Sequence, residues 1–109
     1  MTARRVAVTG VGMVSPLGAT AQASFDALLA GRSGVRLHAP ADAPKPLALP
    51  AGICADFDPA AAFGRAKAGT LDRFSQLGIA AGLESWRDAG LEPAADEDRE
   101  AWGVAWGTG

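Results

Sequence analysis

The first feature of the sequence that could bind a ligand is a glycine turn after a short apolar run. Gly10 and Gly12 follow residues 6–8, which are Val, Ala and Val. A glycine turn between a strand and a helix can seat the pyrophosphate of a dinucleotide on backbone N–H groups. Here the third glycine of that motif would fall at Ser15, with Pro16 behind it, and the acidic ribose ligand expected about 20 residues later is absent. The turn is therefore interpreted as structural, and a small nucleotide-binding domain stays as an alternative.

Cys54 is the only thiol of the chain and the obvious candidate for a nucleophile. A catalytic cysteine needs a helix amino terminus or a basic partner that favours its thiolate. Cys54 instead lies in an apolar stretch close to Asp56 and Asp58, whose carboxylates disfavour a thiolate. The sequence predicts a structural cysteine, and a single cysteine forms no internal disulfide.

The remaining polar residues predict no metal site and no serine triad. His38 is the lone histidine, with no second His or Cys close by in the sequence to complete a metal site. Ser15 and Ser75 have no histidine placed to activate them. Asp72 and Arg73 stand at a helix start, where interaction with the helix dipole and solvent is expected. No residue is assigned as catalytic, cofactor-binding or metal-ligating on this basis.

Two short segments are predicted to be strands of one parallel sheet. Residues 6–8 are apolar without alternation, which is typical of a strand buried on both faces. Residues 101–107 alternate, with Trp102, Val104 and Trp106 on one face and small residues on the other. Because helices lie between the two segments, a βαβ-type crossover with parallel pairing is expected. The predicted fold class is α/β.

Three helices are predicted between these strands, followed by a loop with a short helix over residues 92–100. Thr20 is a suitable N-cap for a helix over residues 20–30, and Gly31 ends it. A brief second helix is expected to start with Asp58 as its N-cap and Pro59 at its first position. The longest helix is predicted over residues 70–89, with a glycine C-cap at Gly90. Because this helix is apolar nearly all round, we expect it to be buried on more than one side.

The segment between the first two helices is predicted to be irregular up to residue 50 and a short strand over residues 51–55. Residues 32–50 contain four prolines. Proline removes a backbone donor, so this density argues against regular pairing.

Composition excludes several classes of function. The 109 residues have room for one domain, and a net charge of −2 provides no basic patch for nucleic acid. No apolar run approaches the roughly 20 residues that span a bilayer. Arg4 and Arg5 ahead of residues 6–14 imitate a secretory signal, but Thr9 and the glycines make a poor hydrophobic helix. With one cysteine, a cytoplasmic location is expected.

Four segments agree in order and spacing with a known family. They are residues 4–18 (Arg-Arg-Val-Ala-Val-Thr-Gly-Val-Gly-Met-Val-Ser-Pro-Leu-Gly), 25–35, 71–91 and 102–109. Together they resemble the amino-terminal part of β-ketoacyl-acyl-carrier-protein synthases of the ketosynthase II type. The resemblance implies that residues 1–109 are a single partial domain, the first part of a thiolase-like αβαβα fold.

The resemblance also implies an activity, partners and one candidate site. The complete enzyme would be an acyltransferase that condenses an acyl thioester with malonyl-acyl carrier protein, as a homodimer or ketosynthase-like heterodimer, without metal or redox cofactor. The family's nucleophilic cysteine, two histidines and lysine lie downstream of residues 102–109, so the 109 residues alone are expected to be inactive. Gly107, Thr108 and Gly109 would lie at the edge of the acyl pocket, with a tight turn as the alternative. A non-catalytic subunit of the chain-length-factor type is the rival function.

Overall fold

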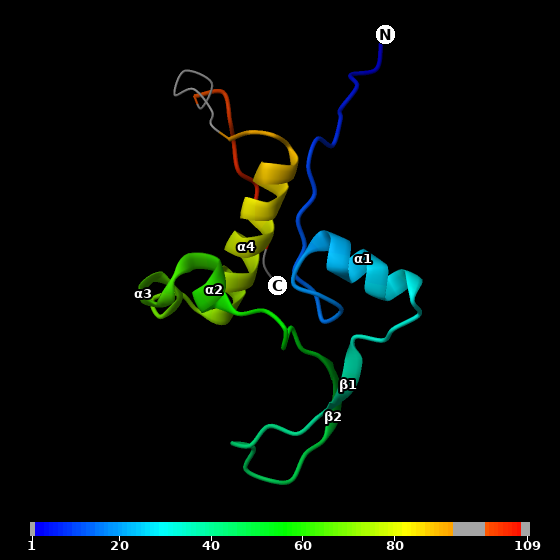
Figure 1. The fold of residues 1–109 in the computed structure, drawn as a ribbon, viewed down its shortest axis with the longest axis vertical. Coiled ribbons are helices and arrows are strands. Elements are labelled where there is room, and N and C mark those ends of the chain that lie inside the picture. The colour runs from blue at the N-terminus through cyan, green and yellow to red at the C-terminus, as the bar shows by residue number, and fades with distance from the viewer. Residues whose placement is uncertain (1, 93–99, 108–109) are drawn as a thin grey trace.

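The computed structural model describes residues 2–92 and 100–107, which form four helices and one two-stranded sheet (Figure 1). In chain order these elements are α1 (Ala21–Leu29), β1 (Val35–His38), β2 (Leu49–Gly52), α2 (Pro59–Phe63), α3 (Arg65–Ala68) and α4 (Arg73–Asp88). The sheet projects away from the helices, and α2 and α3 lie beside α4. The radius of gyration is 17.5 Å, whereas a compact domain of this length has about 13 Å. The chain is therefore an open, mixed α/β arrangement.

The predicted starts of the first two helices are confirmed. The Thr20 side chain accepts a hydrogen bond from the Ala23 N–H at 3.1 Å, and Asp58 accepts one from Ala60 N–H at 2.8 Å. Pro59 occupies the first position of α2. Gly31 follows α1 with a φ of 67°, a left-handed conformation that favours glycine. These helix ends follow from local sequence alone.

The longest helix is present, but it is shorter at both ends than predicted. It begins at Arg73 because Asp72, not Thr70, is the N-cap and accepts from the Ser75 N–H at 3.0 Å. The Thr70 hydroxyl instead donates to the Lys67 carbonyl at 2.8 Å, at the end of α3. At the other end Ala89 is the C-cap, and Gly90 follows it. Most of the loop and short helix predicted over residues 92–100 lies outside the residues that the structure describes.

The expectation that this helix is buried on several sides is wrong for the described part of the chain. No residue of α4 is buried, and the Phe74 side chain is 63% exposed. Two sets of residues contact its apolar surface. They are the glycines of the amino-terminal segment and the pair Trp102 and Trp106. The apolar pattern identified a helix correctly, but the layers that would cover it are missing among residues 2–92 and 100–107.

The predicted parallel strands are also not formed. Neither residues 6–8 nor residues 101–107 pair in a sheet within the described ranges, and Val6, Val8 and Val104 are 93%, 83% and 91% exposed. A strand needs a neighbour for its backbone hydrogen bonds. Here the chain contacts α4 only after residues 6–8, at Gly10 and Gly12, and Trp102 and Trp106 contact α4 from the other segment. The prediction recognised apolar extended segments but not their partners.

The proline-rich segment contains regular structure, contrary to prediction. β1 and β2 pair antiparallel, with Val35 opposite Gly52 and His38 opposite Leu49. The predicted strand over residues 51–55 therefore begins two residues earlier and ends at Gly52. Pro50 lies inside β2, which is tolerated because a two-stranded ribbon has open edges where a missing N–H can face solvent.

The largest buried side chain lies where α2, α3 and α4 meet. Phe57 is 7% exposed and packs edge-on against Phe63, with ring centroids 6.2 Å apart. Arg73 covers the other side, with its guanidinium 5.3 Å from the centre of the Phe57 ring. The same guanidinium donates to the carbonyl oxygens of Cys54 at 2.7 Å and Phe57 at 3.5 Å. Arg73 thus ties the start of α4 to the segment before α2, a role beyond the solvent and dipole interaction predicted for it.

Replacing Arg73 with lysine is expected to lower the free energy of unfolding by about 1 kcal/mol, since a point charge cannot bind two carbonyls and stack on the ring together. Urea unfolding of the protein would measure this loss. Arg65→Lys is the matched control, because Arg65 is exposed on α3. Equal unfolding midpoints for the two variants would contradict the role given to Arg73.

Candidate functional site

The turn predicted at Gly10 and Gly12 is not formed: the chain is extended there, and the turn comes later, at Pro16 and Leu17. The extended glycine segment lies directly on the backbone of α4. A Cβ on Gly10 would lie 2.6 Å from the Ala89 nitrogen, and a Cβ on Gly12 would lie 2.5 Å from the Ser85 nitrogen and closer still to the Ala81 carbonyl oxygen. Real Cβ atoms do not approach backbone atoms so closely, and the backbone of a helix cannot move aside. These two glycines are therefore required for the extended segment to cross the helix.

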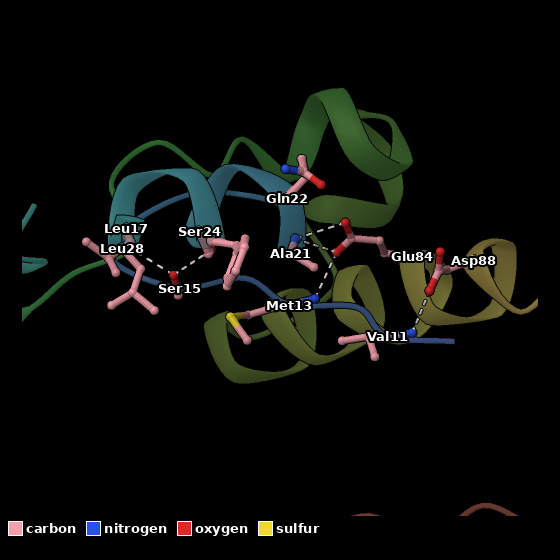
Figure 2. A pocket seen from close by; sticks show the side chains of 11 residues that line it. Val11, Met13, Ser15, Leu17, Ala21, Gln22, Ser24, Leu28, Glu84 and Asp88 are labelled. Atoms are coloured by element: carbon pink, nitrogen blue, oxygen red, sulfur yellow. Dashed lines mark hydrogen bonds between the residues drawn. The ribbon is translucent and has the colours of Figure 1, made fainter. Parts of the chain in front are cut away.

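Two carboxylates of α4 bind the backbone of the same segment. Asp88 accepts a hydrogen bond from the Val11 N–H at 2.9 Å, and Glu84 accepts one from the Met13 N–H at 2.8 Å. Glu84 also accepts from the Ala21 N–H, at the first turn of α1, with distances of 2.9 and 3.2 Å to its two oxygens. Figure 2 shows these contacts side by side. A carboxylate at a helix amino terminus is further favoured by the helix dipole.

This arrangement argues against nucleotide binding. A phosphate at a glycine turn needs free backbone N–H groups and a positive local potential. Here the N–H groups of Val11, Met13 and Ala21 already bond to carboxylates, and a phosphate there would meet two negative charges. The geometry thus favours the structural interpretation of the turn.

The serines near the turn take part in the same structural contacts, between the amino-terminal segment and α1. The hydroxyl groups of Ser15 and Ser24 lie 2.7 Å apart, and Ser24, which is 4% exposed, also donates to the Gly18 carbonyl at 3.2 Å. Ser15 and Gly18 exchange backbone hydrogen bonds across the turn at 2.9 and 3.1 Å. Ser75 belongs to the first turn of α4, where its backbone N–H is capped by Asp72.

The other candidate residues lie apart from one another. His38 is exposed in β1, and Cys54 is half-buried between β2 and α2. The hydrogen bond from Arg73 reaches the carbonyl oxygen of Cys54, not its sulfur. Within the described residues no group of three or more His, Cys, Asp or Glu could hold a metal ion.

A hollow of about 550 Å³ lies between the glycine turn, α1 and α4 (Figure 2). Its apolar lining consists of Val11, Met13, Leu17, Phe25 and Leu28. The carboxylates of Glu84 and Asp88 stand at the end away from Leu17 and Leu28. The hollow contains no base placed beside a nucleophile, so its chemistry is that of packing and binding.

A second apolar hollow, of about 500 Å³, contains the described part of the predicted acyl-pocket edge. Gly107 lines it together with Val14, Trp106 and three α4 residues near Gly78, namely Phe74, Leu77 and Ala81. The Trp106 ring fits over Gly78, where a Cβ would lie 2.6 Å from Cη2 of the ring. Thr108 and Gly109 lie outside the described residues. The lining contains no charged side chain, which is compatible with an alkyl chain.

Sequence reasoning missed Glu84 and Asp88 as partners of the glycine turn. They are one helical turn apart, which is a signal that they share a face of α4. Nothing in the sequence, however, places that face against residues more than 70 positions away. The packing of Trp102 on Trp86, edge-on with centroids 4.8 Å apart, was missed for the same reason.

None of the helices among the described residues is long and apolar enough to span a membrane.

Comparison with known proteins gives consistent matches. Residues 3–109 match the family model described as the N-terminal domain of beta-ketoacyl synthase. The chain is 42% identical over 109 residues to 3-oxoacyl-[acyl-carrier-protein] synthase 2 of Vibrio harveyi, covering 100% of this chain and 26% of that protein. It is 39% identical over 106 residues to the tetracenomycin polyketide synthase ketoacyl synthase alpha subunit of Streptomyces glaucescens, covering 96% and 24%. The chain thus spans about a quarter of the length of these relatives. No solved structure matches it.

Proposed function

The chain belongs to the β-ketoacyl synthase family, and from this premise we propose that it forms the amino-terminal part of a 3-oxoacyl-[acyl-carrier-protein] synthase. The single observation that carries the proposal is the match over residues 3–109, together with the identity to relatives of that name over the whole chain. In the complete protein this segment supplies scaffold and one edge of the acyl pocket.

The proposed reaction is a decarboxylative condensation. A cysteine outside residues 1–109 takes the acyl group from its carrier-protein thioester, which releases the carrier thiol. Malonyl-acyl carrier protein then loses carbon dioxide, and the resulting carbanion attacks the acyl-enzyme thioester. The cysteine leaves as thiolate, and the product is a 3-oxoacyl chain two carbons longer. No described residue takes part, in keeping with the lack of a nucleophile–base pair in the two hollows.

The thiolase-like αβαβα architecture is part of this proposal. The accessible surface of the chain is 8795 Å², whereas a compact monomer of its mass exposes about 5,600 Å². The excess includes Val6, Val8 and Val104, which belong to the segments predicted as strands. We propose that these segments join a larger parallel sheet in the complete protein.

The partners in this proposal are acyl carrier protein, as the donor of both substrates, and a second ketosynthase copy. A cytoplasmic location is proposed with them. A polyketide pathway stays as open as fatty-acid synthesis, because relatives of both kinds cover nearly the whole chain. The proposed acyl-pocket edge is Gly107, Thr108 and Gly109, supported for Gly107 by its place in an uncharged apolar hollow.

The test is condensation by the full-length protein, followed as carbon dioxide release and 3-oxoacyl product from acyl- and malonyl-carrier protein. We expect turnover by the full-length protein and none by residues 1–109 alone. A full-length protein that binds carrier proteins without turnover would favour the non-catalytic subunit instead. Turnover by the 109 residues alone would contradict the assignment of catalysis to the rest of the protein.

A further inference from the structure

Glu84 connects three parts of the chain that are distant in sequence. Its carboxylate belongs to α4 and accepts hydrogen bonds from Met13 in the glycine turn and from Ala21 at the start of α1. Both carboxylate oxygens are used, because Oε1 and Oε2 each accept from the Ala21 N–H and Oε2 also accepts from Met13. The side chain is half-buried between these segments. Its position is therefore set by hydrogen bonds to two backbone segments.

The held segment continues directly into the second hollow. Val14 follows Met13 and lines that hollow together with Trp106 and Gly107. The opposite wall belongs to α4, the helix that carries Glu84. A hydrogen bond at Met13 thus sets the distance between Val14 on one wall and α4 on the other. Gly12 crosses α4 at the neighbouring position without a Cβ, so the segment has no side chain there to hold it in place of the hydrogen bond.

We propose that Glu84 is a positioning residue for the acyl-pocket edge at Gly107. This inference rests on the proposed function, since it needs an acyl chain as the ligand. Glu84 touches no reacting atom. It holds Val14 at its distance from Trp106 and Gly107, and so sets the width of the apolar space that the acyl chain of the substrate meets.

Charge and geometry make glutamate specific at this place. Two N–H groups converge on one carboxylate, which offers only acceptors. Glutamine has the same size, but it offers one oxygen and one NH₂ group. With its oxygen at the place of Oε2, the NH₂ group faces the Ala21 N–H at 2.9 Å, and in the opposite orientation it faces the Met13 N–H at 2.8 Å. Glu84→Gln therefore disturbs the contact in either orientation without creating a cavity, and the packing of α1, the Met13 segment and α4 is expected to shift.

The test compares acyl chain lengths in the full-length enzyme. We expect Glu84→Gln to change the ratio of kcat/KM between a long and a short acyl-carrier protein by roughly threefold or more, since one methylene in an apolar pocket alters discrimination by about 10-fold. Asp88→Asn is the matched control, on the same helix and with the same loss of charge. Asp88 accepts from the single Val11 N–H, and an amide oxygen can replace it there. This variant should keep the wild-type ratio.

A purely structural role predicts equal losses for all chain lengths, so an unchanged ratio in an active Glu84→Gln enzyme would overturn the proposal. If the variant fails to fold, hydrogen exchange in the wild-type protein decides. The Met13 and Ala21 amides should then exchange far more slowly than the Val11 amide, which has a single exposed acceptor, and equal rates would refute the role of Glu84. Absence of condensation by the wild type would instead refute the proposed function.

Discussion

Gly12→Ala is expected to destabilise the protein by about 3 kcal/mol, the upper part of the range for overpacking. The added Cβ would lie 2.5 Å from the Ser85 nitrogen and closer to the Ala81 carbonyl oxygen. Both atoms belong to the backbone of α4, so the clash cannot be relieved by turning a side chain. The extended segment would have to lift off the helix, which breaks the hydrogen bonds of Val11 and Met13. Urea unfolding followed by fluorescence would measure the loss.

The matched control is Gly82→Ala on α4 itself. A Cβ at Gly82 meets no atom within 4 Å, and alanine is favoured over glycine in a helix interior by about 1 kcal/mol. The same chemical change should therefore stabilise at one glycine and destabilise at the other. If Gly12→Ala unfolded at the wild-type urea concentration, the close crossing of the turn and α4 would be wrong.

Phe57→Ala is expected to cost about 3 to 4 kcal/mol, as for other buried aromatic residues. The ring is 7% exposed and is enclosed by Phe63 on one side and the Arg73 guanidinium on the other. Its removal leaves a cavity at the joint of α2, α3 and α4 and removes the surface on which Arg73 stacks. The loss would be seen as a lower midpoint in thermal or urea unfolding.

The control for this prediction is Leu37→Ala in β1, where the side chain is 76% exposed. Its truncation should change stability by less than about 1 kcal/mol. A loss at Leu37 as large as that at Phe57 would mean that the hairpin, not the Phe57 contact, is the stable part of this structure.

Helix starts could be predicted from the sequence because their causes are local. Thr20 and Asp58 each cap a backbone N–H two or three residues away, and the residues that decide the helix end lie within one turn. Asp72 follows the same rule, and the start was placed at Thr70 because two residues that can cap a helix, Thr70 and Asp72, lie two positions apart. Here local chemistry was sufficient.

The sheet could not be predicted in the same way, because pairing depends on partners distant in sequence. The segment with Val6 and Val8 has strand composition, yet both side chains are exposed. Pro50, which argued against a strand, is part of β2. In both places the sequence does not indicate which other segment lies beside the strand.

The candidate site shows the same difference between local features, which could be predicted, and contacts between distant residues, which could not. That the glycine turn is structural could be argued from Ser15 and Pro16, which break the nucleotide-binding pattern. That its N–H groups bond to Glu84 and Asp88 could not be argued, because the contacts join residues 71 and 77 positions apart. The family resemblance, carried by four spaced segments, was confirmed by the match over residues 3–109.

The most direct test of the central claim is to locate the acyl group on the full-length protein by mass spectrometry. The protein is incubated with an acyl-carrier protein in the absence of malonyl-carrier protein and then digested into peptides. We predict one added acyl group, on a cysteine outside residues 1–109, with Cys54 unmodified. An acyl group on Cys54 alone, or no acylated peptide at all, would contradict the proposal that this chain is the amino-terminal, scaffold-forming part of a condensing enzyme.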